Sequence, residues 1–252
     1  MTADPLRANY AHCESEVREA DRDRWLASLF APAERRPHLH ALYAFDRELA
    51  LVPHRVREAL AGEIRLQWWR DALAGEARGD AAANPVAAAL LDTIARCALP
   101  REPLDVLIDA RALDLYDDPL SSLDELATQG RRTASTIFGL AARILDRDAD
   151  VADVAGPAGI AATLVASLQN PAHHSTRIAF APADLAARAR EELDRVRRHW
   201  HLVSPAALPA FLPLAVVSAE LTRAGHDPVK PVRLAPWRRQ WLLWRAARRG
   251  VF

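Results

Sequence analysis

Apolar residues recur along most of the chain three and four positions apart, the spacing that places them on one face of an α-helix. Runs that alternate apolar and polar residues, which are typical of half-buried β-strands, are almost missing. The pattern therefore predicts an all-α fold. We expect helices over residues 8–29, 33–51, 57–76, 84–97, 101–115, 121–146, 149–169, 182–200, 204–224 and 234–249.

Prolines are expected to separate these helices, because proline lacks a backbone N–H and fits a helix only in its first turn. Positions between helices or in first turns are expected for Pro32, Pro53, Pro85, Pro100, Pro119, Pro157, Pro171, Pro182, Pro205 and Pro228. The segment 170–182, "NPAHHSTRIAFAP", is the least helical stretch, and we expect it to be irregular.

The composition narrows the class of protein. The chain has 252 residues, 50% of them hydrophobic, which is enough for one substantial core, so we expect a single domain over residues 1–252. Its formal net charge is zero and gives no indication of a nucleic-acid partner. Cys13 and Cys97 are far apart and form no metal-binding or disulfide pattern, which fits a reducing compartment.

Targeting signals do not stand out in the sequence. The N-terminal residues are charged from the start and lack the apolar region of a signal peptide. No stretch of about 18 apolar residues without charges occurs, so no transmembrane helix is expected. These features predict a cytoplasmic protein.

Several segments together, in the same order along the chain, resemble the squalene/phytoene synthase family. They are "LYAFDRELA" (42–50), "GEIRLQWWRDAL" (62–73), "LIDARALDLYDD" (107–118), "TASTIFGLAARIL" (133–145), "GIAATLVASLQNPAHHSTRIAFAPADL" (159–185) and "LLWRAARRG" (242–250). The resemblance implies an isoprenoid-synthase-like helical bundle around a central cavity. It also implies that active members join two prenyl diphosphates, which Mg²⁺ holds on two aspartate motifs with acids four positions apart.

The acids of both motifs are missing at the positions that match. The first motif falls on Leu49, Ala50, Leu51 and His54, and the second has Asn170 and His174. Asp46 and Glu48 remain nearby, but two positions on a helix point about 200° apart, and we expect Pro53 to close the turn. The family's tyrosine falls on Gln129 and its glycine on Ser135, whereas the frame residues Tyr43, Phe45, Arg47 and Arg177 match.

Three interpretations of function follow. "AFDRELALV" followed by "GEIRLQWWRDAL" resembles the bacterial relatives of the mitochondrial complex I assembly factor of this fold, which implies a non-catalytic assembly or lipid-binding role without a cofactor. Its partners would be respiratory complex subunits and an isoprenoid or other lipid in the cavity. Alternatively, the chain is a prenyltransferase with a rebuilt, Mg²⁺-dependent diphosphate site. Alternatively, His54, His173 and His174 hold a transition metal, since imidazole suits such ions.

Several candidate residues keep two interpretations each. The three histidines also fit polar loop positions. Gln67 and Trp68 border a lipid-sized cavity, or belong to a core helix with tryptophans as packing units. Arg47 and Arg177 bind a phosphate, or form ion pairs with Glu48, Glu63 or Asp184. Asp114 and Asp118 form a displaced acid pair, or Asp117 and Asp118 are solvated turn acids before Pro119.

The C-terminal segment 234–249 combines tryptophans with arginines. Trp237, Trp241 and Trp244 are interleaved with Arg238, Arg239, Arg245, Arg248 and Arg249. Such a helix could lie on an anionic membrane surface, which would place the protein peripherally on the inner membrane. In the other interpretation, the helix packs its tryptophans on the domain and leaves its arginines in water.

Overall fold

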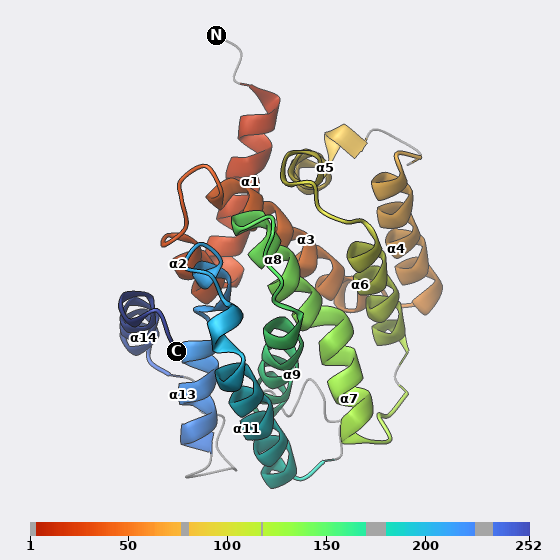
Figure 1. Ribbon diagram of the computed structural model, residues 1–252. Helices are drawn as coiled ribbons and strands as arrows, with labels where there is room; N and C mark the ends of the chain where they lie inside the picture. Colours follow the sequence, from red (N-terminus) through yellow and green to blue (C-terminus); the bar gives the residue numbers. More distant parts are fainter. Residues whose placement is uncertain (1–3, 77–80, 117, 170–179, 225–233) are drawn as a thin grey trace.

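The protein is described from a computed structural model, which covers residues 4–76, 81–116, 118–169, 180–224 and 234–252 (Figure 1). All regular secondary structure in these ranges is helical, which confirms the predicted all-α class. The longer helices are α1 (Pro5–Ala20), α3 (Arg36–Arg55), α4 (Ala59–Ala74), α5 (Pro85–Cys97), α6 (Glu102–Ala112), α8 (Thr136–Leu145), α9 (Ala152–Gln169), α11 (Pro182–Arg198), α13 (Leu214–Ala224) and α14 (Pro236–Arg249). The shorter helices are α2 (Arg22–Ser28), α7 (Leu123–Gly130) and α12 (Leu208–Phe211), with the single turns η1 (Ala81–Ala83), η2 (Leu113–Leu115), η3 (Arg131–Ser135) and η4 (Trp200–Leu202).

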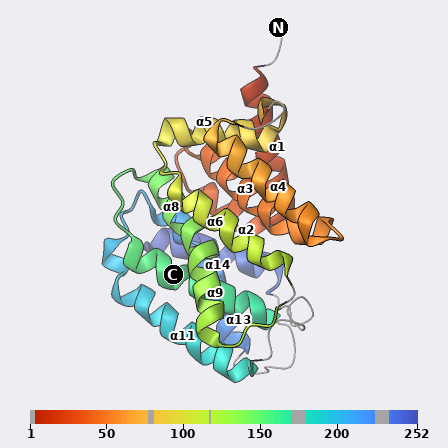
Figure 2. The same ribbon diagram turned by 90° about the vertical axis from the view of Figure 1, so that its right-hand side faces the viewer.

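The helices form two groups around a shared core. Helices α1, α3 and α5 pack against one another, and α7, α8, α11 and α13 pack against α9. Figure 2 shows the first group in the upper part of the molecule and α9, α11 and α13 in the lower part, with α6 and α8 between them. Phe45 and Phe211 are among the largest fully buried side chains. Phe45 packs on Trp69 of α4, and Phe211 stacks on Phe138 of α8.

The expected helix 8–29 is divided at Asp21. The Asp21 side chain accepts a hydrogen bond from the backbone N–H of Arg24 (3.1 Å), so it caps the start of α2 as aspartate commonly does. Similarly, the expected helix 204–224 is divided into α12 and α13. At Asp21, the residue that caps the start of α2 is also the one at which α1 ends.

The expected positions of Pro53 and Pro157 are wrong. Pro53 does not close the turn, because α3 continues to Arg55, and Pro157 lies inside α9. Pro53 is in the last turn, so little of the helix depends on the hydrogen bond that it removes. Helix α9 packs against helices on several sides, and this packing outweighs the local cost of proline.

The expected helix 121–146 contains a change of helical pitch. Residues Arg131–Ser135 form a π-turn between α7 and α8, where the backbone of α9 approaches closely. A Cβ atom on Gly159 would lie 2.0 Å from the backbone nitrogen of Ser135, so only glycine fits there. The π-turn therefore lies where the backbone of α9 approaches that of the neighbouring helix closely.

The C-terminal helix α14 lies at the edge of the molecule, at the left in Figure 1. Its buried side chains are Leu242, Leu243 and Ala246, which form a small apolar cluster with residues of α2 and α13. The interpretation in which its tryptophans pack on the domain is wrong, because Trp237, Trp241 and Trp244 are exposed. Among the described residues, no helix is both long enough and apolar enough to cross a bilayer.

Candidate functional site

Helix α3 places a carboxylate inside the protein. Its residues from Leu39 to Asp46 are all buried, and the side chain of Asp46 is only 10% exposed. Asp46 lies one turn after Leu42 and one turn before Leu49, so it belongs to the apolar face of the helix. A buried carboxylate is stable only when charged or hydrogen-bonding groups pair with it.

Two arginines pair with Asp46. Arg24 of α2 donates from Nη1 to Oδ2 (2.9 Å), and Arg111 of α6 donates from Nη2 to Oδ1 (3.0 Å). Burial raises the pKa of the Asp46 carboxyl, but Arg111 and then Arg24 outweigh burial and hold the pKa below its ordinary value. Asp46 is therefore ionised at neutral pH, and each of its oxygens accepts a hydrogen bond from a guanidinium.

The ion pairs continue to Gln129 through Asp114. Arg111 Nη1 lies 3.4 Å from Asp114 Oδ2, and Gln129 Nε2 donates to Asp114 Oδ1. The side chain of Asp114 is 15% exposed and is held by these two contacts. An acid pair of Asp114 with Asp118 stays a prediction. Asp118 is exposed, and Asp117 lies outside the described residues. This chain of contacts, which we call the Asp46 network, connects α2, α3, α6, η2 and α7.

Tyr43 lies beside the Asp46 network. Its side chain is buried, and the guanidinium carbon of Arg24 lies 5.1 Å from the centre of its ring. Burial raises the pKa of the Tyr43 phenol far above its ordinary value, so the phenol stays neutral. Tyr43 therefore lies against the Arg24 guanidinium as a neutral ring.

A small pocket opens next to Asp46. It has a volume of about 150 Å³ and is lined by Tyr43, Asp46 and Arg47 of α3 together with Val17, Ala20, Asp21 and Arg24. Pockets for small-molecule ligands usually measure about 300–1,000 Å³. This pocket therefore has room for a few water molecules or a small ion, and is too small for a prenyl diphosphate.

Arg47 pairs with a residue that the sequence did not indicate. Its Nε lies 3.5 Å from Oε2 of Glu16 on α1, instead of near Glu48, Glu63 or Asp184 as expected. The pairing follows from the packing of α1 on α3, which spacing along the chain does not reveal. Both side chains are about 40% exposed, so the pair contributes little to stability.

A larger pocket lies at the other end of the Asp46 network. It has a volume of about 370 Å³ between α6 and α7 and is lined by Ala110, Leu113, Leu120, Ser122, Asp124, Glu125, Thr128, Gln129 and Arg132. Gln129 is therefore one of the residues that line this pocket. Its amide is already used as the donor to Asp114.

Gln67 and Trp68 lie away from both pockets. Gln67 is exposed and donates from Nε2 to Asp71 Oδ1 (2.7 Å) on the same helix. Trp68 is half-buried and contacts the edge of Trp69, and it is Trp69 that reaches Phe45 of α3 (4.9 Å between ring centres). This geometry favours the core-helix interpretation of α4, although Ile64 on the same helix is 63% exposed.

The remaining candidates do not meet in the described part of the structure. Ala50 and Leu51 are half-buried on α3, and His54 is exposed in its last turn. Asn170, His173, His174 and Arg177 lie outside the described residues. Within the described ranges, no group of three His, Cys, Asp or Glu residues is close enough to hold a metal ion.

The Asp46 network is the part of this site that sequence reasoning missed. Asp46 was set aside because it cannot share an ion with Glu48. The available signal was its place on the apolar face between Leu42 and Leu49, which requires a cationic partner. The identity of the partners, Arg24 and Arg111, depends on how α2 and α6 pack and could not be inferred from the sequence.

Comparisons with known proteins agree with this architecture. A family model described as squalene/phytoene synthase matches residues 17–179. A curated relative named "NADH dehydrogenase (ubiquinone) complex I, assembly factor 6" from Rattus norvegicus is 32% identical over 179 residues, which are 70% of this chain and 54% of the relative. The chain spans about half the length of the curated relatives of this name.

Two solved structures share the fold. The squalene synthase HpnC from Alicyclobacillus acidocaldarius matches with a TM-score of 0.75 at 24% identity, covering 90% of this chain and 97% of that protein. A dehydrosqualene synthase in complex with a ligand matches with a TM-score of 0.79 at 16% identity, over 98% of this chain and 99% of that protein. These similarities confirm the expected isoprenoid-synthase fold.

Proposed function

The chain belongs to the squalene/phytoene synthase family, and we propose that it is a non-catalytic member that assists the assembly of a respiratory complex. The proposal is supported by the similarity to relatives named as complex I assembly factors, which covers about 70% of this chain. The match covers less than two thirds of the length of each relative, so the assembly role is a proposal for this chain.

The single observation that carries the non-catalytic part is the pairing of Asp46 with two arginines at 2.9 and 3.0 Å. Ionisation of a prenyl diphosphate requires Mg²⁺ held by several oxygen ligands. On α3, the buried carboxylate of Asp46 already accepts hydrogen bonds from Arg24 and Arg111, whose positive charges repel a further cation. Glu48 lies two positions on and points about 200° away, so it cannot share an ion with Asp46. Ala50 and Leu51 offer no side-chain oxygen. The described residues of α3 therefore do not fit Mg²⁺.

The pocket that the described residues form next to Asp46 is also small for the substrate of a synthase. The pocket at Asp46 measures about 150 Å³, and Tyr43 and Arg47 in its wall are paired with neighbouring residues. Asn170 and His174, at the positions that match the second motif, are neutral or weakly basic and do not replace carboxylates. The helices of the family fold are thus retained, while the charged side chains next to α3 pair with one another.

The assembly role is tested by removing the gene from its host. We expect membranes isolated from the deletion strain to show less NADH-dependent quinone reduction. We also expect native gels to show less of the assembled respiratory complex that carries out this reaction. Re-expression of the wild-type chain and of an Asp109→Ala control, which alters only an exposed ion pair with Arg70, should restore both. Unchanged activity and complex abundance in the deletion strain would contradict the assembly role.

A further inference from the structure

The orientation of α14 on the body of the protein is fixed by a partly buried cluster of charges. Arg239 donates from Nε to both carboxylate oxygens of Asp23 on α2 (3.0 and 3.2 Å), and its Nη1 donates to Glu220 of α13. Glu220 is 5% exposed. Because charge-assisted hydrogen bonds to two helices hold this one side chain, the face of α14 that points outward is also determined.

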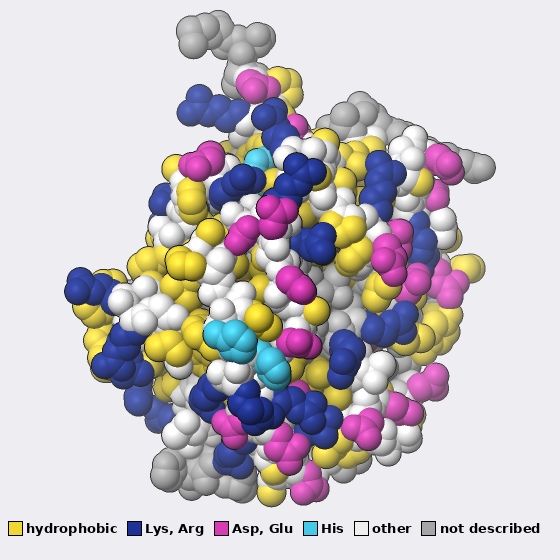
Figure 3. All heavy atoms as spheres, in the orientation of Figure 1, with side chains coloured by type: hydrophobic (Ala, Val, Ile, Leu, Met, Phe, Trp, Pro, Cys, Tyr) yellow, Lys and Arg dark blue, Asp and Glu magenta, His cyan; other side chains and the backbone are white. Residues whose placement is uncertain are grey.

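The outward face of α14 is a stripe of tryptophans. Trp237, Trp241 and Trp244 are 70%, 47% and 50% exposed. The guanidinium of Arg245 lies over the ring of Trp241 (4.6 Å), and that of Arg248 over the ring of Trp244 (5.3 Å). In Figure 3, arginines and apolar side chains stand side by side at the left edge of the molecule, where Figure 1 places α14. Large indole rings beside cationic groups are typical of surfaces that meet a membrane interface.

A groove runs beside this stripe, between α13 and α14. It has a volume of about 740 Å³, and Trp241 belongs both to its wall and to the tryptophan stripe. Its apolar lining consists of Ala215, Ala219, Leu242, Ala246, Val251 and Phe252. Ser218 and Thr222 also line the groove, but the Ser218 hydroxyl accepts a hydrogen bond from Arg197 and the Thr222 hydroxyl donates to the Ser218 carbonyl. The rest of this floor is an apolar surface that suits a hydrocarbon chain.

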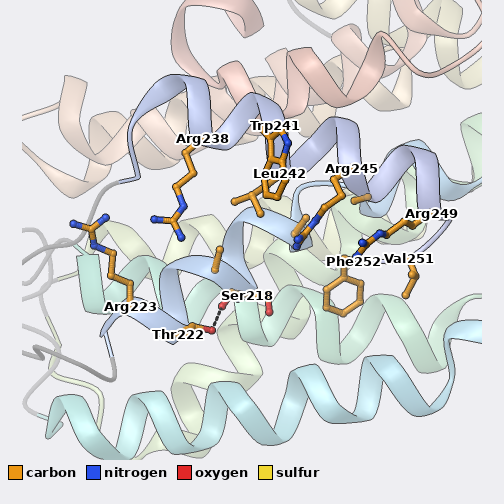
Figure 4. Close-up of a pocket in the computed structure, with 13 residues that line it drawn as sticks. Ser218, Thr222, Arg223, Arg238, Trp241, Leu242, Arg245, Arg249, Val251 and Phe252 are labelled. Carbon is orange, nitrogen blue, oxygen red and sulfur yellow. Dashed lines mark hydrogen bonds between the residues drawn. The ribbon is translucent and has the colours of Figure 1, made fainter.

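Four arginines surround the groove. Arg238, Arg245 and Arg249 come from α14, and Arg223 comes from α13. Figure 4 shows the guanidinium groups of Arg238 and Arg223 directed into the space between the helices, and those of Arg245 and Arg249 next to each other. Among the described residues, no Asp or Glu lines the groove, and none of these arginines takes part in an ion pair. The groove is therefore strongly cationic around an apolar floor.

Arginines around an apolar floor favour the binding of an anion that carries a hydrocarbon chain. Guanidinium groups bind phosphate oxygens through paired hydrogen bonds, and several of them around one anion relieve their mutual repulsion. A free phosphate would leave the apolar floor exposed to water, whereas a neutral lipid would leave the arginines without a counterion. A phospholipid in an anionic membrane satisfies both, and the tryptophan stripe would then enter the interface next to it.

We propose that the α13–α14 groove and the tryptophan stripe form a docking site for an anionic phospholipid at a membrane surface. The lipid phosphate lies on the arginines, and one acyl chain follows the apolar floor. This site lies outside the Asp46 network, so it does not depend on whether the protein is an assembly factor. It places the protein peripherally on a membrane.

The test is co-sedimentation of the full chain with vesicles of phosphatidylcholine, with and without phosphatidylglycerol. We expect binding to the anionic vesicles at least about tenfold tighter than to the neutral ones, and weakening at high salt. Arg238→Glu/Arg245→Glu should reduce the affinity for anionic vesicles by about tenfold or more. The matched control is Arg190→Glu/Arg198→Glu on exposed positions of α11, which makes the same change of net charge and should stay within about twofold of wild type.

Further readouts separate the possible occupants. Circular dichroism should show that the charge-reversal variant is folded, since both arginines lie on the surface of the groove. Addition of anionic vesicles should shift the tryptophan emission to shorter wavelength, and Trp237→Ser/Trp244→Ser should reduce the shift. Equal binding by the groove variant and the control variant would overturn the proposal. Loss of vesicle binding on addition of inorganic phosphate would also overturn it, because it would indicate that the groove binds a free anion. A dimer of the wild-type chain that the groove variant dissociates would overturn it too, because the groove would then be a subunit interface.

Discussion

At the scale of single residues, the candidate site depends on the carboxylate of Asp46, which is paired with the guanidinium groups of Arg24 and Arg111. Asp46 is nearly inaccessible to water, while the side chains of Arg24 and Arg111 are 20% and 19% exposed. Their attraction offsets the cost of removing the carboxylate from water, which is why the carboxylate can remain on the apolar face of α3.

Replacement of Asp46 by alanine should lower the free energy of unfolding by about 2–4 kcal/mol, because it leaves two largely buried guanidinium groups without their shared partner. Urea denaturation followed by circular dichroism measures the change. Asp109→Ala serves as the control, because Asp109 is about half exposed in its pair with Arg70, and it should cost less than about 1 kcal/mol. Equal losses in both variants would show that Asp46 behaves as a surface acid.

The depressed pKa of Asp46 also predicts how stability depends on pH. A carboxyl with a lower pKa in the folded state stabilises the protein fully above its unfolded pKa of about 3.9, and this contribution is lost as pH falls through the folded pKa. The difference in unfolding free energy between wild type and Asp46→Asn should therefore be constant above about pH 5 and shrink below about pH 4. A difference that is the same at pH 3 and pH 7 would contradict the pairing.

The residues of the site were predictable to different degrees. Tyr43, Arg47 and Gln129 were singled out from their positions in family motifs, and all three line pockets in the structure. Gln67 was also singled out, but its amide bonds to Asp71 one turn away, a contact that competes with any role in the interior. Glu16, Arg24 and Arg111 could not be predicted, because their contacts join helices that are distant in the sequence.

At the scale of elements, α9 is positioned by backbone contacts as well as by side chains. Gly159 faces the π-turn η3, where the backbone nitrogen and hydroxyl of Ser135 occupy the place of a Cβ atom. The Ser135 hydroxyl donates to the carbonyl of Gly156 (2.7 Å). The π-turn thus joins α9 to the segment that carries Gln129, and it affects the geometry of the larger pocket.

Gly159→Ala should destabilise the protein by about 3 kcal/mol, because the new methyl group can be accommodated only if the backbones of α9 and η3 move apart. Gly139→Ala on α8 is the control. The contact that a Cβ atom would make there is with the Cβ of Ala155 at 3.9 Å, an ordinary distance, so this variant should be neutral or more stable by up to about 1 kcal/mol. Thermal melts of the two variants provide the comparison, and a stable Gly159→Ala protein would rule out the close approach.

Most helices were predictable from their apolar periodicity, because each buries one face against the core. Their interruptions were less predictable. The division at Asp21 uses a capping residue that also occurs inside helices, and the π-turn at Arg131–Ser135 is imposed by α9. The exposure of Trp237, Trp241 and Trp244 was left open by the sequence, since helix periodicity alone does not say which side of α14 meets the body. The ion pairs of Arg239 decide that question.

At the scale of the whole molecule, the fold of a prenyl-transferring enzyme is combined with a site whose charges are paired internally. The described helices superpose on synthases over nearly their full length, so loss of the fold does not explain the changed site. The strongly cationic surface lies instead at the groove between α13 and α14. A scaffold of this kind would keep its shape for contact with a membrane and a respiratory complex while performing no chemistry at α3.

The most direct test of the non-catalytic claim is release of pyrophosphate from farnesyl or geranylgeranyl diphosphate, measured with Mg²⁺ and the protein in molar excess over the substrate. Single-turnover conditions detect even very slow ionisation, and an active squalene synthase under the same conditions is the positive control. We predict release at the rate of the solution without protein, because Asp46 is held by Arg24 and Arg111 and is unavailable to Mg²⁺. Stoichiometric release of pyrophosphate with formation of a condensed prenyl product would contradict this claim and identify the protein as a synthase.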